Sequence, residues 1–189
     1  MVKAKTRSGL FALKLAVKHG LSLQCLKMLA NGLIFSHLHY CDTVLGQASK
    51  TVLKSLQSRQ DQVIRAFFKL GPWTIVDQYR RRLGWLDLEG KRNVHLTTLI
   101  YRSLKQQSPV AINAMFSRVD LSKKNHISPR DRPTDVVIPN WTNNRLQSTL
   151  TYRGASLWNS LPSTVHKAKD AGICRERAYK HFLKTNYIL

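Results

Sequence analysis

The feature that most constrains the fold is a helical repeat of apolar residues between residues 49 and 70. The repeat advances by 3, 4, 3 and 4 residues through Leu53, Leu56, Gln60, Val63 and Phe67. This spacing places the five side chains on one face of an α-helix, with Gln60 as the single polar residue in it. We therefore predict a packed amphipathic helix with solvated basic side chains on its other faces, ended by Gly71–Pro72.

Two shorter helices are predicted at the N-terminal end. Residues 9–19 and 22–35 both carry leucines at helical spacing. Gly20 separates the two segments, and Ser22 is a suitable N-cap for the second because its hydroxyl can accept from a first-turn backbone N–H.

Helical patterns also mark the middle and the end of the chain. We predict a helix over residues 88–106, with Asp87 as its cap and Glu89 in its first turn, where a negative charge is favourable. A basic helix is predicted over residues 171–186. Trp85 is interpreted as a core residue because its sequence neighbours are apolar.

The region between these helices shows turn and strand signals. Residues 118–135 contain prolines and several basic residues and are predicted to form a loop. Val136–Ile138 and Leu150–Tyr152 are predicted to pair as a small β-hairpin across a polar turn near Asn143–Asn144. The fold class expected is mainly α, a helical bundle with a small β-hairpin and a C-terminal helix.

The charge of the chain favours a polyanionic partner. Thirty-one Lys and Arg stand against ten Asp and Glu in 189 residues, which gives a formal net charge of +21. Such a surplus attracts polyanions, and phosphate neutralisation supplies most non-specific affinity for nucleic acid. A membrane surface or an acidic protein is the alternative partner. No apolar run is long enough to predict a membrane span.

The cysteines and histidines do not predict a disulfide framework or a cofactor site. Three cysteines lie far apart in the sequence, which favours a reducing intracellular compartment over secretion. The expected location is nuclear or cytoplasmic, and the nuclear part of this expectation comes from the basic charge. His37, His39 and Cys41 could bind zinc together only on a strand, and the local pattern is helical. Cys174 beside Arg175 is compatible with a thiol of lowered pKa or, in the favoured interpretation, with a buried or solvated structural cysteine.

The segment Tyr152–Pro162 combines residues with separate physical roles. Gly154 permits a backbone turn, Trp158 offers a large face for burial with one N–H to satisfy, and Pro162 can open a helix. The segment resembles the "RG-x-x-LWN-x-LP" signature near the C-terminus of jockey-like non-LTR retrotransposon polyproteins.

Three further blocks resemble the same family in the same order. They are Leu33–Cys41 ("LI-x-PHL-x-YC"), Leu83–Leu88 ("LGWLPL") and the terminal basic helix ("FK-x-x-LK-x-x-L"). The family's usual Trp after the first block is Leu45 here, and Tyr179 replaces a Phe in the last. The resemblance implies the thumb and following segment of a reverse transcriptase, the region after the palm that holds template and primer.

We expect the chain to divide into three parts. Residues 1–117 form a thumb-like helical region, residues 118–135 a basic loop, and residues 136–189 the hairpin, the signature segment and the terminal helix.

The sequence does not predict a polymerase active site. Nucleotidyl transfer needs clustered carboxylates that hold two metal ions roughly 4 Å apart. The ten acidic residues are scattered: Asp42, Asp61, Asp77, Asp87, Glu89, Asp120, Asp131, Asp135, Asp170 and Glu176. We therefore expect no catalysis by the chain alone, no cofactor and no metal.

The expected activity is binding to the backbone of RNA or an RNA–DNA hybrid. The first set of candidate phosphate contacts precedes or lies on the helix over 88–106: Arg80, Arg81, Arg82, Lys91, Arg92, Arg102 and Lys105. The three consecutive arginines are expected to be exposed, and the helix presents its bases on the side opposite its leucines. A second set lies on the terminal helix: Arg175, Arg177, Lys180 and Lys184.

Three alternatives remain open at this stage. The chain could be a protein-interaction remnant, because a thumb without its palm exposes the apolar surface that met the palm. It could act only together with the palm and fingers part of a reverse transcriptase. It could also be a retroelement-derived reading frame without a function.

Overall fold

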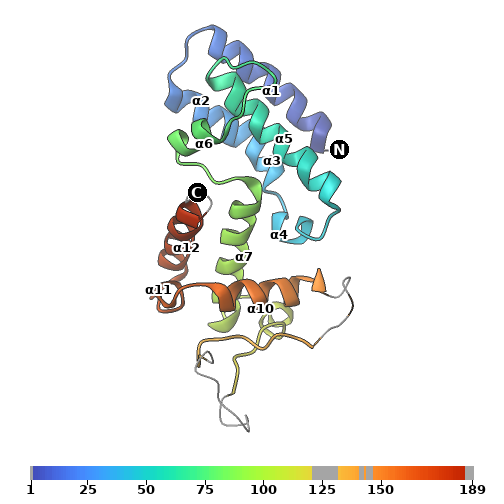
Figure 1. Cartoon of the computed structure of the whole chain (residues 1–189), viewed down its shortest axis with the longest axis vertical. Helices are drawn as coiled ribbons and strands as arrows, with labels where there is room; N and C mark the ends of the chain where they lie inside the picture. Colours follow the sequence, from blue (N-terminus) through green and yellow to red (C-terminus); the bar gives the residue numbers. More distant parts are fainter. Residues whose placement is uncertain (1, 121–131, 141–142, 144–146, 186–189) are drawn as a thin grey trace. The chain divides into compact units, whose positions relative to one another are not determined.

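The computed structural model describes residues 2–120, 132–140, 143 and 147–185, with side chains from residue 6 onward (Figure 1). Its regular structure is almost entirely helical, which confirms the predicted mainly-α class. The chain divides into two compact units, built on residues 1–92 and 93–185. The boundary lies inside a helix, whereas the sequence-based division was placed after residue 117.

The first unit contains six α-helices, a π-helical turn and the start of a seventh α-helix in the described residues. These are α1 (Val2–Lys18), α2 (Leu23–Ala30), η1 (Asn31–Phe35), α3 (Ser36–Leu38), α4 (Asp42–Leu45), α5 (Lys50–Phe67), α6 (Asp77–Leu83) and the start of α7 (Leu88–Leu104). The predicted cap of α2 is confirmed, since Ser22 Oγ accepts from the Cys25 N–H at 3.3 Å. Asp87 likewise caps α7 by accepting from the Gly90 N–H at 2.7 Å.

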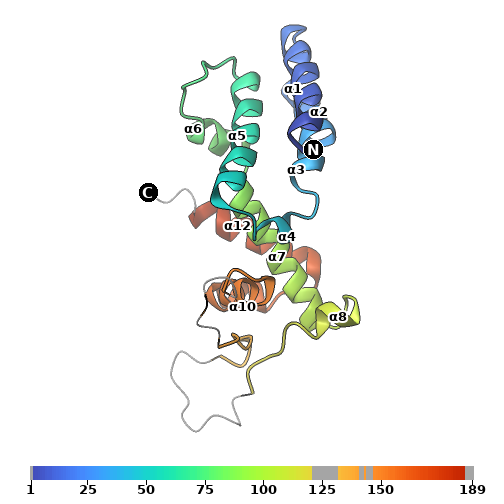
Figure 2. The same cartoon turned by 90° about the vertical axis from the view of Figure 1, so that its right-hand side faces the viewer.

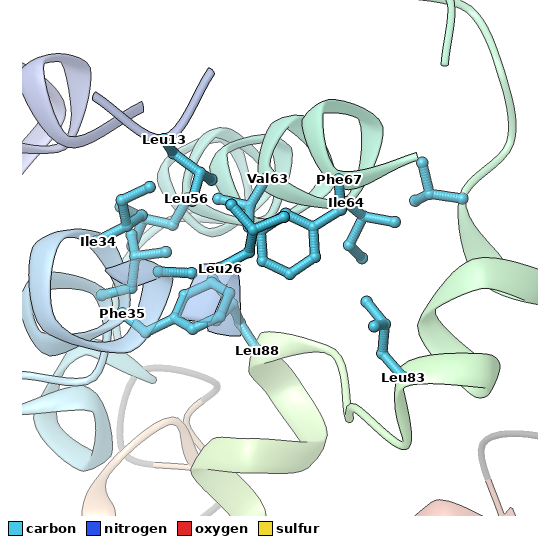
Figure 3. Close-up of a cluster of buried hydrophobic side chains, with 13 residues drawn as sticks. Leu13, Leu26, Ile34, Phe35, Leu56, Val63, Ile64, Phe67, Leu83 and Leu88 are labelled. Atoms are coloured by element: carbon cyan, nitrogen blue, oxygen red, sulfur yellow. The ribbon is translucent and has the colours of Figure 1, made fainter. Parts of the chain in front are cut away.

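The core of the first unit gathers side chains from α1, α2, η1, α5, α6 and the start of α7 (Figure 3). The predicted stripe of α5 faces into it: Leu56, Val63 and Phe67 are buried, and Leu53 is half-buried. The periodicity of this helix is thus explained by its burial against several partner helices. Helix α5 ends at Phe67, before the predicted stop, because Lys69 takes a left-handed backbone conformation with φ of 52°.

Gln60, the polar residue in the α5 stripe, forms hydrogen bonds through both its amide nitrogen and its amide oxygen. Gln60 Nε2 donates to the Leu86 carbonyl at 2.9 Å, and Gln57 Nε2 donates to Gln60 Oε1 at 2.7 Å. Gln57 Oε1 in turn accepts from the Leu88 N–H at 2.9 Å. These bonds satisfy the side chain of a buried glutamine and two backbone groups where α7 begins.

Trp85 belongs to the same core, as the sequence indicated. Its ring stands edge-on to Phe35 at 5.0 Å between centroids and is tilted against Phe67 at 5.6 Å. Such aromatic geometries add to the gain from burial. Trp85 is half-buried and contributes to the packing of this core.

The second unit contains the rest of α7 together with α8 (Val110–Asn113), α10 (Leu150–Ser160), α11 (Ser163–His166) and α12 (Ala171–Thr185). Helix α11 begins directly after Pro162, as expected from the sequence. Part of the predicted loop, residues 121–131, lies outside the described residues, as does Asn144 of the predicted turn.

The predicted hairpin is wrong. Leu150–Tyr152 form the first turn of α10, and Val136 instead makes an isolated antiparallel bridge with Arg118. Helix α10 buries Ala155 and Trp158 on one face. The burial of this face outweighs the local β-propensity of a short Thr–Tyr pair.

Gly154 has a different role from the turn predicted for it. It lies inside α10, where a Cβ would stand 2.8 Å from Phe116 Cε1 and 3.2 Å from Ile100 Cδ1. Only a residue without a side chain allows this approach. Gly9 in α1 shows the same relationship, because a Cβ there would lie 2.8 Å from the Leu33 carbonyl oxygen. Both glycines serve close packing.

The signature segment fastens residues 132–136 to α10 and α11. Trp158 is 2% exposed, and its Nε1 donates to the Thr134 carbonyl at 2.9 Å, which confirms the predicted burial and the need for a partner. His166 stacks on the Trp158 ring with 4.6 Å between centroids. Arg132 Nη1 donates to the Leu161 carbonyl at 3.2 Å. The signature segment therefore has a structural role, since it holds residues 132–136 against α10 and α11.

Candidate nucleic-acid interface

Arg80, the first of the predicted phosphate contacts, is buried in the first unit. Arg80 is only 7% exposed, and its Nη2 meets Asp61 Oδ1 at 2.7 Å while its Nη1 pairs with Asp77. Burial acts to lower the pKa of Arg80, but the two carboxylates outweigh it and the pKa is raised. The expectation that all three arginines are exposed is wrong for Arg80, which is an internal ion-pair residue.

The other two arginines of α6 reach the surface. Arg81 and Arg82 are exposed. The Arg82 guanidinium carbon lies 5.9 Å from the centre of the Phe68 ring, within the range of a cation–π contact. Arg82 therefore keeps its charge at the surface while its position is partly fixed by an aromatic face.

Helix α7 presents fewer bases than its sequence suggests. Arg92 is 7% exposed, and Lys91 is half-buried. Arg102 is exposed in the last turn and Lys105 just beyond it. The apolar side is buried as predicted, with Ile100 at 0% exposure. Within the second unit, the exposed bases of this helix are thus confined to its C-terminal end.

Helix α12 carries the most accessible predicted set. Arg175, Arg177, Lys180 and Lys184 are all exposed. At 100° per residue, Arg177, Lys180 and Lys184 share one side of the helix, whereas Arg175 lies across from them. The buried residues Cys174, Ala178 and Phe182 anchor an adjoining side of the helix, between Arg177 and Arg175.

Two local contacts shape this basic face. Arg177 Nη1 donates to the Thr164 carbonyl at 2.6 Å, which ties α12 to α11. Lys180 pairs with Glu176 at 2.6 Å, with both side chains more than 60% exposed. An exposed pair of this kind is weak and easily exchanged for another anion. Lys180 therefore remains accessible to a phosphate, and Lys184 extends the face by one turn.

A basic groove that the sequence analysis missed lies between α1 and α5 in the first unit. It has a volume of about 820 Å³. Four bases line it: Lys14, Lys18, Arg65 and Lys69. The signal in the sequence is the matching spacing of 14 with 18 and 65 with 69, one helical turn in each case. The two helices had to be placed together before these pairs became one surface.

The described residues support neither a zinc site at His37, His39 and Cys41 nor a reactive thiol at Cys174. Within the part of the chain that the structure describes, no group of three or more His, Cys, Asp or Glu could hold a metal ion. His37 lies in α3, while Cys41 is exposed beyond its end. Cys174 is buried, and burial raises the pKa of its thiol to about 11. The alternative of a lowered pKa at this cysteine is wrong.

No helix among the described residues is long and apolar enough to cross a membrane. Comparison of the chain with family models, with curated proteins and with solved structures found no match.

Proposed function

We propose that the chain is a non-catalytic nucleic-acid-binding protein that grips the backbone of RNA or an RNA–DNA hybrid. We further propose that it derives from the thumb and following segment of a jockey-like reverse transcriptase, on the basis of the four sequence blocks described above. The palm and fingers part of such an enzyme is then a natural second partner.

The observation that carries this proposal is the basic side of α12. Arg177, Lys180 and Lys184 stand on one side of a helix that is packed through buried residues on an adjoining side, so their Cα positions are fixed by packing. A rigid row of bases at helical spacing can follow successive phosphates. The net charge of +21 adds a long-range attraction to any polyanion.

The test is binding of the full chain to labelled RNA, duplex DNA and an RNA–DNA hybrid by fluorescence anisotropy across a salt series. Micromolar or tighter binding to RNA or hybrid, with affinity that falls steeply with salt, is the expected result. Binding that is weak, equal for every polyanion and lost near physiological salt would overturn the proposal.

Two charge-removal variants locate the binding residues. Lys180→Gln with Lys184→Gln tests α12, and Arg102→Gln with Lys105→Gln tests the end of α7. Removing one lysine or arginine that neutralises a phosphate should lower the salt slope by about 0.7 on single strands and about 0.9 on duplex. Lys167→Gln with Lys169→Gln is the matched control, since both lysines are exposed and lie outside the proposed binding residues.

A second candidate function is protein interaction. It is favoured by large apolar side chains at the surface of the first unit, including Ile75 at 76%, Phe11 at 72% and Met28 at 61% exposure. Size-exclusion chromatography at high salt tests it, because high salt suppresses charge-driven association. A mass that rises with protein concentration supports self-association, and a constant monomer mass counts against it.

A further inference from the structure

The groove between α1 and α5 is built from one face of each helix. Helices α1 and α5 are neighbours in the first unit (Figure 2). On α1 the lining residues are spaced by 4, 3 and 1 positions from Leu10 to Lys18. On α5 and its C-terminal extension they are spaced by 4, 3, 1 and 3 from Ser58 to Lys69. Lys14, Lys18 and Arg65 are therefore held in place by two packed helices, and Lys69 lies in the turn that directly follows α5.

The charge of this groove is one-sided. The described side chains that line it include four bases and no acid. Helix α1 contains no acidic residue, and Asp61, the one acid of α5, is ion-paired to Arg80. Lys14, Lys18 and Lys69 are exposed. The positive potential of the groove is therefore not neutralised from within the two helices that form it.

The groove also has an apolar component. Leu10, Val17, Ala66, Leu70 and Pro72 lie among its bases. An anion site for a small inorganic ion needs no such surface. A strand of nucleic acid does, because its sugars and bases are partly apolar while its phosphates are charged.

An exposed aromatic residue directly follows a lining residue of the groove in the sequence. Trp73 follows the lining residue Pro72 and is 93% exposed. Its loop is tied to α5 by Arg65, whose Nε donates to the Thr74 carbonyl at 3.2 Å. An exposed indole has gained nothing from burial, and it offers a face on which a nucleobase can stack.

We propose that the α1–α5 groove binds single-stranded nucleic acid, with Lys14, Lys18, Arg65 and Lys69 on the phosphates and Trp73 as a stacking platform. This inference rests on the proposed function and specifies one of its sites and the form of its ligand. A volume of about 820 Å³ suits a short stretch of one strand. A duplex hides its base faces and can offer only phosphates to the rim.

The first experiment compares two variants of the full chain that each lose three positive charges. The groove variant carries Lys14→Gln, Lys18→Gln and Lys69→Gln. The control carries Lys50→Gln, Lys167→Gln and Lys169→Gln, which are also exposed and do not line the groove. Anisotropy with a labelled single-stranded RNA of mixed sequence is measured across a salt series, after thermal melting shows that both variants fold.

The groove variant should lose roughly 2 from the salt slope and on the order of tenfold in affinity near physiological salt. The control should change affinity by less than about threefold, and a duplex of the same length should not distinguish the two variants. If both variants weaken RNA binding equally, the groove inference is overturned while the proposed function stands. If the unmodified chain binds no nucleic acid, both fail.

A second experiment tests the stacking role and the class of ligand. Trp73→Ala should weaken binding of the normal strand by about tenfold or more but leave an abasic strand of equal charge unaffected. An equal loss on both strands, or no loss on either, would contradict the stacking role. Poly-glutamate that binds as tightly as RNA and depends equally on the groove lysines would overturn the assignment in favour of an acidic protein.

Discussion

The side-chain amide of Asn159 is paired with both backbone groups of Val136. Its Oδ1 accepts from the Val136 N–H at 2.8 Å, and its Nδ2 donates to the Val136 carbonyl at 2.9 Å. The amide thus takes the position that a neighbouring strand would occupy in a sheet. The segment around Val136 is thus held by this helix side chain as well as by its backbone bridge to Arg118, and the predicted partner Leu150–Tyr152 is helical instead.

This relationship predicts a strong effect of changing Asn159. Asn159→Ala leaves two backbone groups of a buried residue without partners, which should cost about 2 kcal/mol of unfolding free energy. Urea unfolding followed by tryptophan fluorescence measures the loss. Asn140→Ala, at an exposed position, is the control and should cost less than about 0.5 kcal/mol. Equal stability of the two variants would contradict the prediction.

The close approach at Gly154 makes a second prediction. Gly154→Ala should destabilise the chain by about 1–3 kcal/mol, although alanine is the better helix former, because the added methyl overlaps Phe116. Adding Phe116→Leu should restore part of the loss. Gly32→Ala is the control, since a Cβ there meets no atom within 4 Å. Thermal melts of the three variants give the comparison.

The buried ion pair of the first unit separates a structural arginine from a surface one. Arg80→Ala leaves the Asp61 carboxylate without its ion-pair partner, with the Gln57 amide still donating to it at 2.9 Å, and should cost on the order of 3 kcal/mol. Arg82→Ala, at the surface over Phe68, should cost less than about 1 kcal/mol. Chemical denaturation distinguishes them. Similar losses at both positions would contradict the assignment of Arg80 to the interior.

The histidine stacked on Trp158 predicts a pH dependence of stability. His166 Nε2 lies 2.8 Å from the Trp158 carbonyl, and Nδ1 lies 3.1 Å from Thr134 Oγ1. Burial lowers the pKa of His166 more than the Trp158 carbonyl and nearby Asp135 raise it. Arg132 and Arg118 contribute further lowering of this pKa.

The sign follows from proton binding. A histidine with a lowered folded pKa binds fewer protons folded than unfolded between that pKa and its ordinary value of about 6.5. Stability is therefore full above about pH 6.5 and falls as the pH drops through the folded pKa. His166→Gln should flatten the change between pH 8 and pH 5 in urea unfolding. A residual slope is expected from His181, whose pKa is also lowered by burial. Equal slopes in the variant and the unmodified chain would contradict this account.

The three thiols should differ in reactivity. Cys41 is exposed and Cys25 half-buried, whereas Cys174 is buried with a pKa raised to about 11. Iodoacetamide at pH 8 should alkylate Cys41 first and leave Cys174 unmodified until the chain unfolds, because the thiolate is the reactive form. Peptide mass spectrometry after timed quenching measures this order. Rapid labelling of Cys174 in the folded chain would contradict the observed burial.

The helices with long apolar repeats were predictable from sequence because their periodicity reflects burial on one side. This holds for α5, α7 and α12, and for the caps at Ser22 and Asp87. Helices α6 and α10 were missed, whereas the start of α11 after Pro162 was expected. Helix α6 has only seven residues and was recognised only as a run of bases. Helix α10 contains a glycine whose benefit depends on Phe116, which lies far away in the sequence.

The candidate interface was less predictable because it too depends on contacts between residues that lie far apart in the sequence. A sequence shows that an arginine is present but not whether a distant acid will pair with it, as Asp61 does with Arg80. The α1–α5 groove likewise needs two helices that are separated in the chain by α2, η1, α3 and α4. Surface bases on one helix, such as those of α12, are the part that helical spacing can predict.

The glutamine pair on α5 affects which packing register this helix adopts in the first unit. A helix with only leucines on its buried face can shift by a turn or rotate slightly at little cost, because one apolar contact replaces another. Gln57 and Gln60 meet the backbone of Leu86 and Leu88 in one register alone. Any slip would leave buried amides without partners. The two glutamines thus specify one register of α5 against the start of α7, and they contribute more to the specificity of the fold than to its stability.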